Sequence, residues 1–144
     1  MKKTGIIVAP ILILLIIGGG IIAWSVYQKG EKEPLRRHVI DITDDNFHKE
    51  VVQASLSRPI LVDFYAEWCF PCKMLEPTLE ALSKEFEGRA VIGRVDTDKH
   101  MVARKFGINK LPTVMVIRDK EIKKTWHGVV PKATIAEALE EFGA

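Results

Sequence analysis

A strongly apolar stretch of the chain runs directly into a pair of cysteines. Residues 60–66 read Ile-Leu-Val-Asp-Phe-Tyr-Ala, and this run of β-branched and aromatic side chains predicts a strand buried in the middle of a sheet. The segment Trp-Cys-Phe-Pro-Cys-Lys follows at 68–73, and its proline suits the first turn of a helix. The 144 residues include no other cysteine, so any sulfur chemistry takes place at this strand-to-helix junction.

The two cysteines have the spacing of a reactive pair. Because two residues separate Cys69 from Cys72, their sulfur atoms lie one helical turn apart and can join in a short disulfide. Cys69 lies at the N-terminal edge of the predicted helix, where the positive end of the helix dipole favours a thiolate. We therefore expect Cys69 to attack a partner disulfide and Cys72, one turn deeper, to resolve the mixed disulfide.

Three other interpretations compete with a redox pair. A structural disulfide is one, although closing so short a loop removes little entropy from the unfolded chain. A zinc site is another, but zinc needs four ligands and the chain has no second cysteine pair. Two unrelated buried thiols are the third, and the tight spacing argues against them. The histidines are scattered without ligand spacing, at His38, His48, His100 and His127.

Further short motifs follow the cysteine pair. They are Pro77, Phe106-Gly107-Ile108, Leu111-Pro112-Thr113 and Gly128. Together with the segment 60–73, they make the chain from about residue 38 to its C terminus similar to thioredoxin. The resemblance implies an α/β fold with a central mixed sheet of about five strands flanked by about four helices, and thiol–disulfide oxidoreductase activity.

Asp63 is the charged residue in the apolar run 60–66. An isolated carboxylate is costly to bury, so the side chain either points to solvent or has a function. The resemblance implies a buried acid below the disulfide, with a raised pKa, that moves a proton to or from Cys72. Arg94 falls where thioredoxin has a lysine near this acid, and we expect its permanent charge to modulate Asp63.

The resemblance also implies a groove for a substrate peptide beside the cysteines. In thioredoxin the proline that matches Pro112 is cis and leaves a backbone edge free for an extended peptide. Gly128 is expected to admit the partner backbone because it has no side chain. His127 before it is interpreted as a surface strand residue; the alternative is a side chain near the groove that titrates near neutral pH. Trp68 is expected to shield the cysteine pair. The predicted groove residues are Trp68, Phe70, Pro71, Leu111, Pro112, Thr113 and Gly128.

Two departures from the thioredoxin pattern bear on the direction of electron flow. Phe70 replaces the glycine usual between the first cysteine and the proline, and Tyr65 replaces a tryptophan. We expect a reductase of disulfide-containing proteins. The alternatives are a disulfide donor, acting as oxidase or isomerase, and a non-enzymatic redox-sensing or peptide-binding module. No bound cofactor is needed, because the Cys69–Cys72 pair carries electrons that an upstream thiol donor supplies.

Alternating patterns predict the other elements of the domain. Strands are expected at 39–42, 60–66, 90–95, 113–118 and 121–127, and the last two form a hairpin that turns at Asp119-Lys120. Helices are expected from Asp44 or Asp45, one of which would cap the first helix, to 56, and at 71–87, 99–105 and 132–142. The side chains expected to face the core are Phe47, Val51, Val52 and Leu56 of the first helix, Met74, Leu75, Leu79, Leu82 and Phe86 of the second, and Ile135, Leu139 and Phe142 of the last.

The N-terminal part of the chain predicts a membrane anchor. Residues 5–26 are 22 uncharged and mostly aliphatic residues, and about 20 suffice to cross a bilayer as a helix. Trp24 and Tyr27 lie near the end of this run, where aromatic rings favour the headgroup layer. We expect an uncleaved signal-anchor at 1–28, a charged linker at 29–37 and a thioredoxin-like domain at 38–144. The alternative is a cleaved signal peptide, with Gly18-Gly19-Gly20 or Ala23 in the cleavage region.

The charge distribution separates the same two parts. Residues 1–37 hold six Lys or Arg and two Glu, whereas residues 38–144 hold 15 Lys or Arg and 17 Asp or Glu, which gives no support for a nucleic-acid surface. Basic residues on both sides of the apolar run leave the charge rule equivocal. The short basic tail resembles a signal sequence, so we expect a cytoplasmic N terminus and an extracytoplasmic domain. The short linker predicts membrane-proximal partners, and we expect a monomer.

Overall fold

The computed structural model describes residues 39–144. The anchor predicted over 1–28 and the linker predicted over 29–37 lie outside these residues. Between residues 39 and 144, no helix is both long and apolar enough to cross a bilayer.

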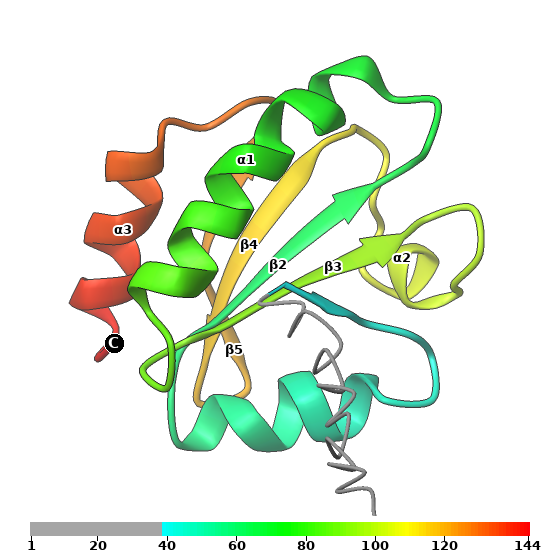
Figure 1. Cartoon of the computed structure of the whole chain (residues 1–144). Helices are drawn as coiled ribbons and strands as arrows, with labels where there is room; N and C mark the ends of the chain where they lie inside the picture. The colour runs from blue at the N-terminus through cyan, green and yellow to red at the C-terminus, as the bar shows by residue number, and fades with distance from the viewer. Residues whose placement is uncertain (1–38) are drawn as a thin grey trace, which may run out of the picture. The chain divides into compact units, whose positions relative to one another are not determined.

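Five strands form one mixed sheet, which confirms the predicted α/β fold of the domain. The order across the sheet is β1-β3-β2-β4-β5 (Figure 1). The first three of these run parallel, and β4 and β5 are antiparallel to their neighbours. The strands are β1 (Ile40–Asp41), β2 (Ile60–Tyr65), β3 (Val91–Asp96), β4 (Thr113–Arg118) and β5 (Glu121–His127).

Helices cover both faces of the sheet (Figure 1). α1 (Phe70–Glu85) and α3 (Lys132–Glu141) pack on one face, where Leu61 of β2 joins their aliphatic side chains. On the other face, Val62 and Phe64 pack against a second set of apolar side chains. The elements of this second face are the π-helix η1 (His48–Gln53), the 3-10 helix η2 (Ala54–Leu56) and α2 (Val102–Lys105).

The alternation of side chains along β2 decides where Asp63 lies. Successive residues of a strand point to opposite faces, so Asp63 shares the face of Leu61, which α1 covers. The strand is central, with β3 on one side and β4 on the other, and all its residues except Tyr65 are buried. A carboxylate is therefore buried in the middle strand of the sheet, directly before the segment that carries both cysteines.

The hairpin between β4 and β5 turns at the two residues that the sequence predicts. Asp119 and Lys120 both have a positive φ, 55° and 64°. A two-residue hairpin turn that follows the twist of its strands needs positive φ at both central residues. Neither is a glycine, and the backbone N–H groups of both donate to Ser55, to its carbonyl and its hydroxyl oxygen respectively. These two hydrogen bonds join the turn to η2.

The predicted cap of the first helix is wrong, and its predicted inward face is right only in part: Val51 is buried and Phe47 packs against the same cluster, whereas Leu56 is exposed. No side chain caps η1 at Phe47; instead Asn46 Oδ1 accepts from the Thr43 N–H at 2.8 Å before the helix begins. Asp44 accepts from the N–H groups of Met101 and Val102, at 2.9 and 2.8 Å, and so caps α2. Leu56 is exposed, because the chain winds as a π-helix and then a 3-10 helix, which rotates the faces away from the 3.6-residue pattern.

Two further expectations for the helices are corrected. Met74 is 57% exposed, whereas Leu75, Leu79 and Leu82 are buried. One residue of an α-helix turns the side chain by about 100°, so Met74 falls beside the buried stripe rather than on it. The helix predicted over 99–105 is shorter in the structure, where it is α2 and begins at Val102. The N–H at the start of α2 donates to the Asp44 carboxylate.

Candidate active site

The two cysteines lie where β2 passes into α1, and they form a disulfide. Cys69 is the N-cap residue of α1, and its sulfur accepts a hydrogen bond from the Cys72 N–H at 3.3 Å. Pro71 occupies the first turn, where its missing N–H leaves no unsatisfied partner. The Cys69 N–H donates to the Ala66 carbonyl at 3.1 Å, which ties the start of the helix to the end of the strand.

The two sulfur-bearing residues line different spaces, although both are nearly buried. Cys69 lines an open groove of about 500 Å³. Cys72 lines a smaller cavity of about 230 Å³. A partner disulfide that enters the groove therefore meets Cys69, whereas Cys72 lies on the inner side of the helix. This asymmetry is the one expected of an attacking and a resolving thiol.

The groove contains some of the predicted substrate-binding residues together with others that the sequence prediction missed. Trp68 and Phe70 are both 72% exposed and form an aromatic border on either side of Cys69. Of the predicted set, Trp68, Phe70, Pro71 and Leu111 line the groove; the missed residues that line it are Thr97, Ile108, Asn109 and Lys110. Thr97 directly follows β3, which runs parallel to β2. Because the ends of adjacent parallel strands lie at the same edge of the sheet, the sequence could have predicted that Thr97 lies near the cysteines.

The other three predicted groove residues, Pro112, Thr113 and Gly128, are not part of this lining. The Leu111-Pro112 peptide bond is cis, as the resemblance implies. The Gly128 N–H donates to the Pro112 carbonyl at 2.8 Å, and Gly128 has a φ of +88° with open space where a Cβ would project. Thr113 is buried, and its hydroxyl lies 2.9 Å from Nδ1 of His127, an exposed residue of β5.

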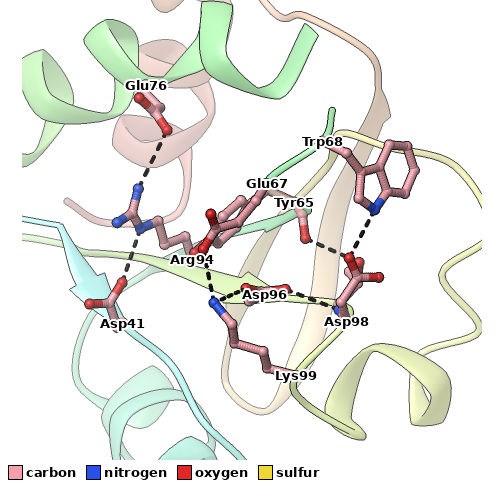
Figure 2. A network of polar contacts seen from close by, with 10 residues as sticks. Asp41, Tyr65, Glu67, Trp68, Glu76, Arg94, Asp96, Asp98 and Lys99 are labelled. Carbon is pink, nitrogen blue, oxygen red and sulfur yellow. Dashed lines mark hydrogen bonds and ion pairs between the residues drawn. The ribbon is translucent and has the colours of Figure 1, made fainter. Parts of the chain in front are cut away.

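Trp68 is held by a carboxylate that the sequence prediction missed. Its indole Nε1 donates to Asp98 Oδ2 at 2.8 Å (Figure 2). The loop before the motif is also tied to the end of β3, because Lys99 bonds to Glu67 at 2.9 Å and to Asp96 at 2.8 Å. These contacts fix the indole, which is exposed, at the border of the groove.

Asp63 is buried on the sheet face that α1 covers. Its side chain is 2% exposed, and among the described residues its Oδ1 has no hydrogen-bond partner. Burial raises the pKa of Asp63 from its usual 3.8 to about 7; the positive charge of Arg94 lowers this pKa and the negative charge of Glu76 raises it. The carboxyl therefore exchanges a proton close to neutral pH, as the resemblance implies for the acid below the disulfide.

Arg94 pairs with Asp63 in the β2–β3 register but extends its guanidinium elsewhere. Its Nε donates to Asp41 Oδ1 at 3.0 Å, and Nη1 lies 3.7 Å from Glu76 Oε1. The guanidinium carbon lies 5.1 Å from the centre of the Tyr65 ring (Figure 2). The described contacts include no ion pair between Arg94 and Asp63, so the charge of Arg94 lowers the pKa of Asp63 from a distance.

The comparison with known sequences agrees with this geometry. The sequence model of the Thioredoxin family matches residues 38–141. The chain belongs to the thioredoxin family. Thioredoxin from Porphyra purpurea is 36% identical over 105 residues, which are 72% of this chain and 96% of that protein. Thioredoxin 1 from Synechococcus elongatus is 37% identical over 101 residues, or 69% of this chain and 92% of that protein.

More distant relatives show the same coverage. Thioredoxin from Pseudomonas aeruginosa is 31% identical over 107 residues, which are 74% of this chain and 97% of that protein. Thioredoxins are disulfide oxidoreductases that reduce protein disulfides. With its Cys-x-x-Cys pair, this chain is a thiol–disulfide oxidoreductase of that family, and the predicted family and enzyme class are confirmed.

Within residues 39–144, no three His, Cys, Asp or Glu side chains lie close enough together to hold a metal ion. The groups that can move electrons and protons are the disulfide and the buried carboxyl of Asp63. The roles given to the individual site residues stay predictions, and they are developed below.

Proposed function

We propose that this protein reduces disulfide bonds of partner proteins, with Cys69 as nucleophile, Cys72 as resolving thiol and Asp63 as proton acceptor. The observation that carries the proposal is the asymmetry of the disulfide. Cys69 lines the open groove, whereas Cys72 is buried and lines the smaller cavity together with Glu76 and Arg94. This difference supports a separate role for each thiol in two successive attacks.

In the first step, the Cys69 thiolate attacks one sulfur of the partner disulfide. A bond forms between Cys69 and that sulfur, the partner's own S–S bond breaks, and one partner thiolate leaves. In the second step, the Asp63 carboxylate takes the proton of the Cys72 thiol, and Cys72 attacks Sγ of Cys69. The second partner thiolate then leaves. The two partner thiolates take up two protons, which balance the one that Cys69 released when it ionised and the one that Asp63 now gives up. Two electrons have passed to the partner, and an upstream thiol donor must reduce the Cys69–Cys72 disulfide again.

The proton affinity of Asp63 suits the second step. A general base works best when its pKa lies near the working pH, and burial raises the pKa of Asp63 to about 7. An exposed aspartate would take up a proton from a thiol far less readily. The Asp63→Asn substitution should therefore slow resolution of the mixed disulfide while leaving the first attack intact.

Reduction of insulin by the full-length protein, with dithiothreitol as donor, tests the proposal. We expect turnover that the Cys69→Ser substitution abolishes. Negligible turnover with a good donor would favour a redox sensor or peptide-binding module instead. The reduction potential of the pair tests the direction: about −270 mV typifies thioredoxin and about −120 mV a strong disulfide donor. A value near the upper end would mean that Phe70 and its surroundings have made the protein an oxidase.

We further propose that residues 1–28 anchor the protein in a membrane with the thioredoxin-like domain outside the cytoplasm, facing membrane-proximal partners. The support is the 22-residue apolar run and the short charged linker that follows it. Alkaline extraction of membranes should leave the protein in the pellet, and release into the supernatant would refute the anchor. A membrane-impermeant thiol reagent should label the reduced cysteines in intact cells, and protection would refute the orientation.

A further inference from the structure

Arg94 lies between two carboxylates in one row across the sheet. It pairs in register with Asp41 of β1 on one side and with Asp63 of β2 on the other. The two acids differ in environment, since the side chain of Asp41 is 47% exposed whereas Asp63 is buried. The guanidinium could bond either, and it bonds Asp41, at 3.0 Å. The buried carboxyl is thus left with its Oδ1 unpaired among the described residues.

Glu76 adds a second anchor on the same outer side. It belongs to α1, one helical turn after Cys72, and its carboxylate reaches down to Nη1 of Arg94 at 3.7 Å (Figure 2). The Tyr65 ring covers the guanidinium from the strand below. Asp41, Glu76 and Tyr65 come from three different elements, and together they fix the direction of one flexible side chain.

These groups meet at the wall of the smaller cavity. Arg94, Glu76 and Cys72 all line this space of about 230 Å³. The charged and titratable groups around it come from every neighbouring element. They are Asp41 of β1, Tyr65 of β2, Arg94 and Asp96 of β3, Cys72, Lys73 and Glu76 of α1, and Glu67 and Lys99 of the loops.

We propose that Glu76 is a positioning residue for proton transfer between Asp63 and Cys72, because, together with Asp41, it holds the Arg94 guanidinium at the wall of the smaller cavity and away from the buried carboxyl. This inference rests on the proposed function of Asp63 as proton acceptor. If the guanidinium turned inward, it would form a direct ion pair with Asp63. Such a pair would hold the carboxylate ionised and make it a poor acceptor for the Cys72 proton.

The electrostatics of the site agree with this geometry. Burial is the main cause that raises the pKa of Asp63; Arg94 opposes it, and Glu76 adds to it. Removing the charge of Glu76 should therefore lower the pKa of Asp63 for two reasons. It withdraws a negative charge from the neighbourhood, and it releases one anchor of the guanidinium. Both changes lower the proton affinity of Asp63.

The test is the titration of Asp63 in the oxidised full-length protein, followed by NMR of ¹³C-labelled aspartate carboxyl carbons. The Glu76→Gln substitution should lower the midpoint by about half a pH unit or more, and Arg94→Gln should raise it. Glu80→Gln is the matched control. Glu80 lies one turn further along the same exposed side of α1, has no ion pair among the described contacts, and should leave the midpoint unchanged. Equal midpoints in Glu76→Gln and Glu80→Gln would overturn the proposal.

A double substitution separates positioning from a direct field effect. If Glu76 acts through Arg94, the shift caused by Glu76→Gln should shrink in the Arg94→Gln background; an equal shift in both backgrounds would overturn the positioning role. The pH profile of mixed-disulfide resolution should move with the NMR midpoint, and a profile that stays in place would also contradict it. Because the titration is measured without turnover, failure of insulin reduction would refute the proposed function separately.

Discussion

The burial of Asp63 predicts that the protein loses stability as the pH rises, and that Asp63→Asn removes this loss. The pKa of Asp63 is about 7 in the folded protein and 3.8 when exposed, so the folded state holds the proton more tightly. The stabilisation from that proton is complete below pH 4 and is lost as the pH rises through 7. Three pKa units correspond to about 4 kcal/mol of stability lost in the wild type by pH 9.

At pH 5 only a part of this loss has occurred. The unfolded chain is already ionised there, whereas Asp63 in the folded protein is still neutral, so the cost is about 1.5 kcal/mol. The asparagine side chain of the variant carries no charge at any pH. The difference in unfolding free energy between Asp63→Asn and wild type should therefore grow by about 2.5 kcal/mol between pH 5 and pH 9, in favour of the variant.

Urea unfolding of the oxidised protein, followed by circular dichroism at several pH values, measures this difference. Any change that the amide itself makes to the unfolding free energy is a fixed amount. This amount is the same at each pH and does not affect how the difference changes with pH. Asp45→Asn, which changes an exposed carboxylate, is the control and should follow the pH dependence of the wild type. Parallel curves for Asp63→Asn and wild type would refute the claim that this carboxyl is buried with a raised pKa.

Three other substitutions test separate parts of the structure. Cys72→Ser should leave a mixed disulfide with insulin unresolved, which non-reducing gels would detect as a higher-mass band; its absence would contradict the resolving role. Asp44→Ala should lower the melting temperature more than Asp45→Ala, because Asp44 alone of the two receives the first N–H groups of α2; equal changes would contradict that cap. Gly93→Ala should destabilise the protein by about 1–3 kcal/mol in denaturant unfolding, because the added Cβ would collide with the Ile42 side chain. An unchanged midpoint would show that Ile42 can move aside without cost.

The sheet could be predicted from the sequence because each strand carries its own local pattern. The apolar run at 60–66 gives β2 within one residue, and the two strand-like runs on either side of Asp119-Lys120 give β4 and β5 with the observed bounds. The cysteine pair falls at the strand-to-helix junction for the same reason, since Pro71 and the strand before it are adjacent in the chain. Local signals sufficed wherever the structure depends on neighbours in sequence.

The charged groups around the site could not be predicted in this way. Trp68 bonds to Asp98, 30 residues away, and Arg94 bonds to Asp41, 53 residues away. These contacts depend on the order and register of strands that meet only in the folded sheet. The exposure of Met74 and Leu56 escaped prediction for a related reason, because a change of helix type or of about 100° in phase moves a side chain from core to solvent.

Asp63 shows how a cost in stability identifies a functional group. Every other residue of β2 suits a central strand, and a valine or leucine at this position would satisfy the same packing without a buried charge. A carboxyl that weakens the fold by several kcal/mol above neutral pH has no role in holding the sheet together. Its position on the sheet face that α1 covers, next to an arginine held outward by Asp41 and Glu76, makes a role in proton transfer at the disulfide the explanation that the surrounding residues support.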